Sequence, residues 1–359
     1  MNEIYNFGAG PACLPSEVLS QIREDIPHWH DGMSVMEISH RLPVFMDLCK
    51  KIEGDLRDLL AIPDNFSVLF MQGGARSQFA GVPLNFLRPG ETADYIVSGH
   101  WSALAYEEAH RYCEPHLVAT SQALNYSQIP AQSDWRLSEQ GIYCHYTDNE
   151  TLQGVEFQQI PPVPGKFLVA DMTSNILSRT IDFSAHGLIY ASAQKNLGIA
   201  GITVVIVRND LLGQANRATP STMDYGLYAQ HDSLYNTPPM FCWYVLGLML
   251  QWAKAQGGCA ALAQAAEQKS AYLYRAIDQS GFYTNPVLKS ERSRINIPFR
   301  LPTEALEQHF LSAADQQGLK QLKGHKAVGG CRASLYNAMP MAGVEALINF
   351  MDHFRITHG

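Results

Sequence analysis

Short apolar runs, rich in Val, Ile, Leu and aromatic residues, recur along much of the chain. Six of them have the length and composition of buried β-strands: Val68–Met71, Asp94–Val97, Ile142–His145, Phe167–Ala170, Leu188–Ala191 and Ile202–Val207. Helical spacing of apolar positions lies between several of these runs, as in Ser77–Leu87, Ser102–Tyr112 and Asp210–Ala215. This alternation predicts an α/β fold with a mostly parallel central sheet. Only ten residues separate the last two strands, which favours an antiparallel pair there.

The pattern changes after about residue 255, where Gly257 and Gly258 end an apolar helix. The later segment predicts helices over Ala260–Ser280, Thr303–Gln317 and Met341–Phe354, and strands over Arg294–Phe299 and Ser334–Tyr336. We therefore expect a large α/β domain over residues 16–256 and a smaller α+β domain made of residues 1–15 and 257–359.

Composition narrows the functional classes. The net charge of −8 argues against nucleic acid as a partner, because nucleic-acid binders usually carry a basic surface. The seven cysteines include no CxxC pair, which favours reduced thiols and a cytoplasmic location. The N-terminus lacks the basic and apolar regions of a signal peptide. The most apolar stretch, Phe241–Leu250, is too short to span a membrane, so no membrane association is expected.

Lys195 is the first candidate for chemistry. It lies among small residues between two predicted buried strands, and burial disfavours the charged ammonium, leaving an amine that can attack a carbonyl group. A lysine on an exposed loop is the alternative. Asp171 closes the predicted strand before it, and strand ends of an open α/β sheet face the binding crevice. Its carboxylate could pair with a protonated pyridine nitrogen, or it could simply cap the following turn.

Other candidates suit a flat, anionic ligand. Gly73–Arg76 forms a glycine-rich turn at a predicted helix start, where free backbone N–H groups favour an anion, although a plain turn is also possible. Trp101 follows a strand and could stack on a ring or belong to the core. Arg41 and Arg332 have the planar guanidinium that binds carboxylates and phosphates, unless they form surface ion pairs. His28 and His30 lack a third ligand at a convincing spacing, so no metal site is expected.

Five sequence blocks identify a family. The segment Tyr190–Asn196, which holds Lys195, resembles the lysine motif of the phosphoserine aminotransferases, a class V family of fold-type I pyridoxal-phosphate enzymes. The other similar blocks, in the same chain order as in the family, are Asn6–Pro11, Ser34–Arg41, Tyr235–Pro239 and Arg332–Pro340. The match covers essentially the whole chain. It implies a fold-type I transferase with a large domain built on a mostly parallel sheet and a smaller α+β domain.

The resemblance also implies residue roles. Lys195 would be the catalytic residue, joined to the cofactor pyridoxal 5'-phosphate and carrying the proton. Asp171 would bind the pyridine nitrogen, Trp101 would stack on the ring and Thr151 would contact the ring hydroxyl. The cofactor phosphate would be bound by Ala75, Arg76 and Gln194, and by Asn236 and Thr237 of the partner subunit of a homodimer. Arg332 would bind the substrate α-carboxylate, and the distal phosphate or carboxylate would be received by His40, Arg41 and His325.

The implied reaction is reversible amino transfer from glutamate to 3-phosphohydroxypyruvate, in serine biosynthesis. A related phosphorylated oxo acid of pyridoxal-phosphate biosynthesis is a further expected substrate. The sequence departs from many relatives at Ala9, where they have serine, and at Ala75, where they often have glycine or valine. Another class V aminotransferase, such as the alanine–glyoxylate type, is the alternative, and the cationic residues His40, Arg41 and His325 argue against it. A cofactor-binding regulator without turnover is a second alternative; the joint presence of Lys195, Asp171 and Arg332 argues against that.

Overall fold

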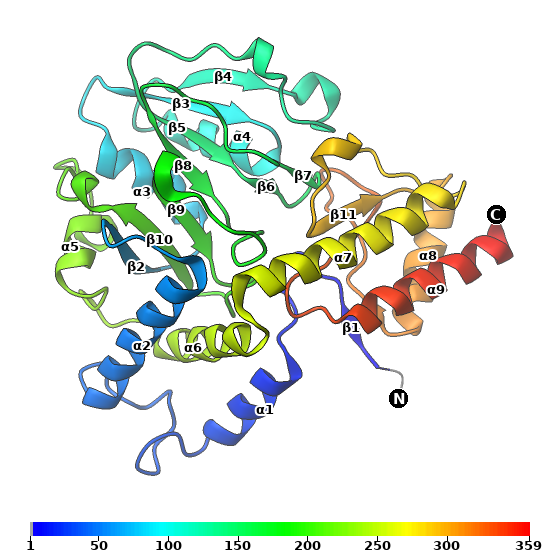
Figure 1. Ribbon diagram of the computed structural model, residues 1–359, viewed down its shortest axis with the longest axis horizontal. Coiled ribbons are helices and arrows are strands. Elements are labelled where there is room, and N and C mark those ends of the chain that lie inside the picture. The colour runs from blue at the N-terminus through cyan, green and yellow to red at the C-terminus, as the bar shows by residue number, and fades with distance from the viewer. Residues whose placement is uncertain (1–2) are drawn as a thin grey trace.

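The computed structural model describes residues 3–359 (Figure 1). Its α-helices are α1 (Ser16–Asp25), α2 (Pro43–Leu60), α3 (Arg76–Phe86), α4 (His100–Ala109), α5 (Tyr225–Gln230), α6 (Met240–Ala255), α7 (Gly258–Gln279), α8 (Glu304–Gln316) and α9 (Met341–His358). Its strands are β1 (Tyr5–Asn6), β2 (Phe66–Gln72), β3 (Thr92–Val97), β4 (His116–Thr120), β5 (Gly141–Thr147), β6 (Asn149–Glu150), β7 (Val155–Glu156), β8 (Phe167–Asp171), β9 (His186–Ser192), β10 (Ile202–Arg208), β11 (Asn296–Phe299), β12 (Leu319–Lys320) and β13 (Cys331–Ser334). No helix within residues 3–359 is both long and apolar enough to cross a membrane.

The central element is a seven-stranded sheet in the order β2-β10-β9-β8-β5-β3-β4. β10 runs antiparallel to both of its neighbours, and the other strand pairs are parallel. The predicted α/β class, the mostly parallel sheet and the antiparallel pair of β9 and β10 are thereby confirmed. Because β2 and β9 both oppose β10, they point the same way, and six strands (β2, β3, β4, β5, β8 and β9) end at one edge of the sheet.

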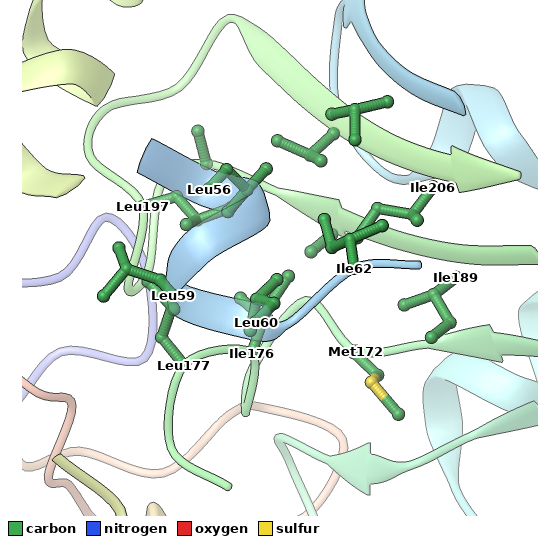
Figure 2. Packing of buried hydrophobic residues seen from close by; sticks show 14 of the residues in the cluster. Leu56, Leu59, Leu60, Ile62, Met172, Ile176, Leu177, Ile189, Leu197 and Ile206 are labelled. Atoms are coloured by element: carbon green, nitrogen blue, oxygen red, sulfur yellow. The ribbon is translucent and has the colours of Figure 1, made fainter. Parts of the chain in front are cut away.

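Both faces of this sheet are covered, as the continuous apolar runs predicted. Along β9 the side chains alternate between two cores: Ile189 belongs to the cluster beneath α2 and α6, and Tyr190 to the cluster beneath α3 and α4. Figure 2 shows part of the first cluster, where Leu56 near the end of α2 lies beside Leu197, and Ile62, just after α2, lies beside Ile206 of β10. Burying such side chains contributes about 1.5–3 kcal/mol each, so the sheet forms a rigid base for the residues at its edge.

The end of the chain packs with its beginning. Phe7 is fully buried in a separate cluster with Phe299 of β11, Phe310 of α8 and Phe354 of α9. β1 pairs in parallel with β12, and Figure 1 shows the blue N-terminal strand beside the orange and red C-terminal elements. We propose on this basis that residues 1–15 and 257–359 form a smaller domain beside a large domain of residues 16–256. Residues 1 and 2 of that division lie outside the described part of the chain.

Two predicted elements are wrong. Residues 210–215 contain no α-helix but a short 3-10 turn, Asn209–Leu211, and Gly213 follows with a φ of 75°, which ends helical geometry. The strand predicted over Ser334–Tyr336 lies earlier, at Cys331–Ser334, because its antiparallel pairing with β11 stops at Ser334. The chain then turns, and the Tyr336 hydroxyl donates to the carbonyl of Ala9 at 2.8 Å.

Candidate active site

A cavity of about 460 Å³ lies at the edge where the six parallel strands end. Its wall combines residues that follow these strands with residues of the last strand, β13, and the loop before it. Nine of the residues expected from the sequence line it: Ala75, Arg76, Trp101, Thr151, Asp171, Gln194, Lys195, His325 and Arg332. Parallel strands that end together explain why residues so far apart in the chain meet here.

Lys195 lies in the tight turn after β9 and is 8% exposed. Its Nζ donates a hydrogen bond to Oγ1 of Thr151 at 2.7 Å. Burial lowers the pKa of this amine to about 8, with the Asp171 carboxylate opposing that shift. A lysine with such a pKa is uncharged in a useful fraction of molecules near neutral pH, which is what nucleophilic attack on a carbonyl carbon requires.

Asp171 is the last residue of β8, and its carboxylate accepts the backbone N–H of Thr173 at 2.9 Å. Burial raises the pKa of this carboxyl group. The hydrogen bonds from Thr173, the charge of Lys195 and the hydroxyl of Tyr190 all act in the opposite direction. Asp171 is therefore a buried carboxylate whose ionised form is stabilised by fixed hydrogen-bond donors. A positively charged ring nitrogen is a suitable partner for it.

A turn suited to an anion lies on the other side of the cavity. Gly73 has a φ of 99°, a left-handed conformation that glycine adopts readily, and α3 begins three residues later. The N–H groups of Ser77 and Gln78 already donate to the carbonyls of Gly74 and Ala75. The backbone donors that this turn can offer to an anion are therefore the earlier amides, those of Ala75 and Arg76, and both residues line the cavity. The guanidinium of Arg76 lies 5.8 Å from the ring centre of Trp101. Gln194 is held nearby because its side-chain oxygen accepts the hydroxyl of Ser192.

Trp101 is fixed in the first turn of α4. Its backbone N–H donates to Oε2 of Glu150 at 3.0 Å, and the same carboxylate accepts both the N–H and the hydroxyl of Ser102. Within residues 3–359 the buried indole Nε1 of Trp101 has no hydrogen-bond acceptor. Glu150 is a residue that sequence reasoning missed, because a buried glutamate that caps a helix from another strand has no local sequence pattern.

The opposite wall is cationic. Arg332 of β13 is 9% exposed, burial lowers its pKa, and its Nε has no acceptor within the described residues. Burial, followed by the charges of Arg332 and Lys326, also lowers the pKa of His325. A buried arginine without a carboxylate partner is costly on its own, so this wall is arranged for an anionic ligand.

Four expected site residues lie outside the cavity of the single chain: His40, Arg41, Asn236 and Thr237. Arg41 is exposed and His40 is half-buried. The side-chain oxygen of Asn236 accepts the Tyr228 hydroxyl at 3.4 Å, and the carbonyl of Thr237 accepts a hydrogen bond from Gln72. The chain therefore completes only part of the expected binding set by itself. Among residues 3–359 no three His, Cys, Asp or Glu side chains are grouped as metal ligands.

Comparison with known proteins decides the family. The sequence profile of the class-V aminotransferases matches residues 4–347. This chain belongs to the class-V aminotransferase family. It is 52% identical over 358 residues to a phosphoserine aminotransferase of Laribacter hongkongensis, with 99% of each chain covered. It is 50% identical to a phosphoserine aminotransferase of Coxiella burnetii, over the full length of both chains.

Solved structures agree. Phosphoserine aminotransferase from Bacillus circulans subsp. alkalophilus superimposes with a TM-score of 0.97 at 44% identity, covering 99% of both chains. The pyridoxal-phosphate-bound phosphoserine aminotransferase of Trichomonas vaginalis gives a TM-score of 0.94 at 41% identity, covering 97% of this chain and 99% of that one. An alanine–glyoxylate aminotransferase of Nostoc shares the fold at 18% identity, with a TM-score of 0.75 and coverage of 99% and 96%. The predicted fold type, the transaminase class and the cofactor pyridoxal phosphate are confirmed.

The residues of this chain fit that cofactor. Lys195 and Asp171 supply a buried amine and a buried carboxylate that line one cavity. The amine suits the carbonyl group of the cofactor, and the carboxylate suits its ring nitrogen. The first turn of α3 and Arg76 supply an anion site. Trp101 adds an aromatic wall, and its indole N–H has no acceptor among residues 3–359. Each of these residues has a charge or polarity that suits the cofactor group it would contact.

Proposed function

We propose that this chain catalyses reversible transfer of the amino group between glutamate and 3-phosphohydroxypyruvate, forming phosphoserine and 2-oxoglutarate. The observation that carries the proposal is a cavity lined by Lys195 and Asp171, with the buried guanidinium of Arg332 and the imidazole of His325 on its wall. Within the described residues, Nε of Arg332 has no hydrogen-bond acceptor. Both substrates carry two anionic ends, and a cationic wall can bind one of them. The names of the full-length relatives at about half identity support the same reaction.

We assign the cofactor contacts as follows. Bound pyridoxal phosphate supplies the carbonyl group that takes the amino group and the ring that withdraws electrons. Lys195 would hold it covalently, Asp171 would pair with its ring nitrogen and Trp101 would cover its face. Its ring hydroxyl would meet Thr151, which already binds Nζ of Lys195 at 2.7 Å. The backbone of Ala75, with Arg76 and Gln194, would bind the phosphate.

The proton steps belong to Lys195. Its pKa of about 8 leaves Nζ able both to accept a proton from the substrate α-carbon and to return it. The Thr151 hydroxyl orients Nζ of Lys195, and because the Lys195 side chain is buried, it has little contact with water. Arg332 binds the α-carboxylate, and because the Arg332 guanidinium carries a charge, its bonds are short and directional. This arrangement fixes which face of the substrate Lys195 reaches.

The active site is shared between two subunits of a homodimer. His40, Arg41, Asn236 and Thr237 lie outside their own cavity, in the loops that precede α2 and α6. These two helices begin beside each other, since the rings of Phe45 and Trp243 are 6.2 Å apart. Four large hydrophobic side chains near this surface are more than a third exposed: Met33, Met36, Leu42 and Met46. A second copy covering them would bring its own cavity to these four polar residues.

In that dimer, Asn236 and Thr237 bind the phosphate of the partner's cofactor. His40 and Arg41 join His325 of the other chain around the distal phosphate or carboxylate of the substrate. The same pocket would accept the phosphorylated oxo acid of pyridoxal-phosphate biosynthesis, whose distal group has the same charge. We also propose a cytoplasmic location, supported by seven cysteines that are all free thiols.

A half-reaction experiment tests the function. The holoenzyme is mixed in turn with phosphoserine, glutamate and alanine, and its cofactor absorbance is followed. We expect phosphoserine and glutamate to convert the cofactor rapidly and alanine to convert it far more slowly. Equal conversion rates for all three substrates, or conversion by alanine alone, would contradict the proposed substrate pair and favour another class-V aminotransferase.

A further inference from the structure

Two buried polar residues lie close to Asp171 on the neighbouring strands, on the sheet face that α3 and α4 cover. Tyr190 is the register partner of Asp171 on β9, and His145 lies on β5, at the other side of β8. Tyr190 is 0% exposed and His145 is 2% exposed. The Tyr190 side chain therefore reaches diagonally under the catalytic edge, and its hydroxyl lies 2.9 Å from Nε2 of His145.

Both rings are neutral. Burial lowers the pKa of His145 to about 3, so this imidazole stays uncharged across the range in which the protein works. Burial, and next the nearby Asp171 charge, raise the pKa of Tyr190, so its hydroxyl keeps its proton. A neutral imidazole has one N–H and one bare nitrogen, and the bond to Tyr190 has a definite direction only when the position of that N–H is known.

The free nitrogen of His145 decides the direction. Within the described residues Nδ1 is buried and has no hydrogen-bond partner. A buried N–H without an acceptor costs more than a bare lone pair without a donor, and orphaned N–H groups are rarer in proteins. The proton therefore resides on Nε2, and this N–H donates to the Tyr190 oxygen. The Tyr190 proton is then free for a second acceptor. Asp171 is its register partner on β8, and within the described residues the Asp171 carboxylate accepts a hydrogen bond only from the N–H of Thr173.

We propose that His145 and Tyr190 are positioning residues that form a polar chain: His145 Nε2–H donates to the Tyr190 oxygen, and this leaves the Tyr190 O–H directed toward the Asp171 carboxylate. The chain holds Asp171 in its ionised form and in a fixed orientation toward the cavity. It rests on the proposed role of Asp171 as partner of the cofactor's ring nitrogen. Neither residue lines the cavity, so we expect them to act through Asp171.

The first test uses two matched hydroxyl deletions. Tyr190→Phe removes the donor to Asp171. Tyr95→Phe removes an equally buried hydroxyl from the same cluster, which pairs with Tyr143 at 3.1 Å, while keeping the ring that stacks 5.2 Å from His145. A hydrogen bond to a charged group changes an equilibrium by about an order of magnitude or more. We expect Tyr190→Phe to raise the pyridoxal-phosphate dissociation constant of the cofactor-free protein about tenfold.

The same variant should show a split in its kinetics. We expect kcat to fall by a similar factor, because Asp171 supports the electron-withdrawing ring, while KM for glutamate changes little, because Arg332 is untouched. Tyr95→Phe should leave the dissociation constant and kcat near wild type. Equal behaviour of the two variants overturns the inference. A wild-type protein that binds the cofactor but does not transaminate would instead contradict the proposed function.

The second test needs no variant protein to be active. Nitrogen-15 labelling of histidine rings reports the tautomer of each imidazole by NMR, and His145→Gln identifies the signal that belongs to His145. We expect the proton on Nε2 in the cofactor-free and in the cofactor-bound protein. A proton on Nδ1 would reverse the bond to Tyr190 and overturn the chain, even if Tyr190→Phe failed to fold.

Discussion

Replacing Glu150 with alanine would test how the sheet holds Trp101 against the cavity. The Glu150 carboxylate is fully buried and accepts the N–H of Trp101 at 3.0 Å, the N–H of Ser102 at 2.8 Å and the hydroxyl of Ser102 at 2.6 Å. The two amides belong to the first turn of α4, where a helix offers no acceptor of its own. A residue 49 positions further along the chain therefore caps this helix.

The expected loss follows from the donors left without an acceptor. In Glu150→Ala the Ser102 hydroxyl can still donate to the Gly99 carbonyl, which lies at 3.2 Å. The two amides have no such substitute, and each buried donor left unpaired costs about 1–3 kcal/mol. We expect the free energy of unfolding to fall by about 2–6 kcal/mol, a large part of the roughly 5–15 kcal/mol that stabilises a typical protein. Glu150→Gln keeps one acceptor oxygen and should lose about half as much.

Urea unfolding of the cofactor-free protein, followed by circular dichroism, measures this loss. Glu107→Ala is the matched control, because Glu107 is an exposed glutamate on the same helix. Titration with pyridoxal phosphate measures the functional consequence, since a loosened first turn displaces Trp101 and should weaken cofactor binding. If Glu150→Ala unfolds at the same urea concentration as Glu107→Ala, the carboxylate does not hold the helix and the reasoning is refuted.

Four further outcomes are expected. Lys195→Ala should abolish transamination yet still bind pyridoxal phosphate non-covalently, and borohydride should fix the cofactor of the wild type to the Lys195 peptide; an adduct on another lysine would contradict this. Arg41→Ala and His325→Ala should each weaken phosphoserine binding about tenfold or more, and alanine binding far less, because a lost charge-assisted bond costs roughly 1.5–3 kcal/mol; equal losses for both substrates would refute a phosphate role. Lys195→Ala refolded with a chain in which Asn236 and Thr237 are both alanine should regain activity, since one site of the heterodimer is intact; formation of heterodimers without activity would count against shared sites. In the cofactor-free protein, burial lowers the pKa of Lys195 to about 8, while the unfolded chain keeps lysine's usual pKa near 10.4. Between these two pH values the unfolded chain binds one more proton, so the unfolding free energy of the cofactor-free wild type relative to Lys195→Ala should rise with pH. A difference in urea unfolding that does not change with pH would contradict the buried amine.

The strand pattern predicted most of the sheet and, with it, much of the site. Asp171 and the turn at Gly73 could be recognised because each follows an apolar run, and parallel strands deliver such residues to one edge. The helix predicted over 210–215 was wrong because spacing alone does not reveal that Gly213 adopts a left-handed conformation. His145 and Tyr190 gave no signal either. In a strand buried on both faces, a histidine and a tyrosine read as ordinary core until the register places them beside Asp171.

The site residues that lie outside the cavity show how much a sequence pattern alone can predict. His40 and Asn236 lie on loops that precede different helices, and neither loop has a pattern that names its ligand. The fold joins them, because the packing of Phe45 against Trp243 brings the starts of α2 and α6 together. The resulting surface is polar at these residues and apolar at neighbours such as Met36, which is 55% exposed. Apolar side chains on such a surface favour association, while the polar ones have no role within their own chain's cavity. The same surface would therefore account for both the proposed dimer and the part of the phosphate site that one chain lacks, and we expect a change that weakens one to weaken the other.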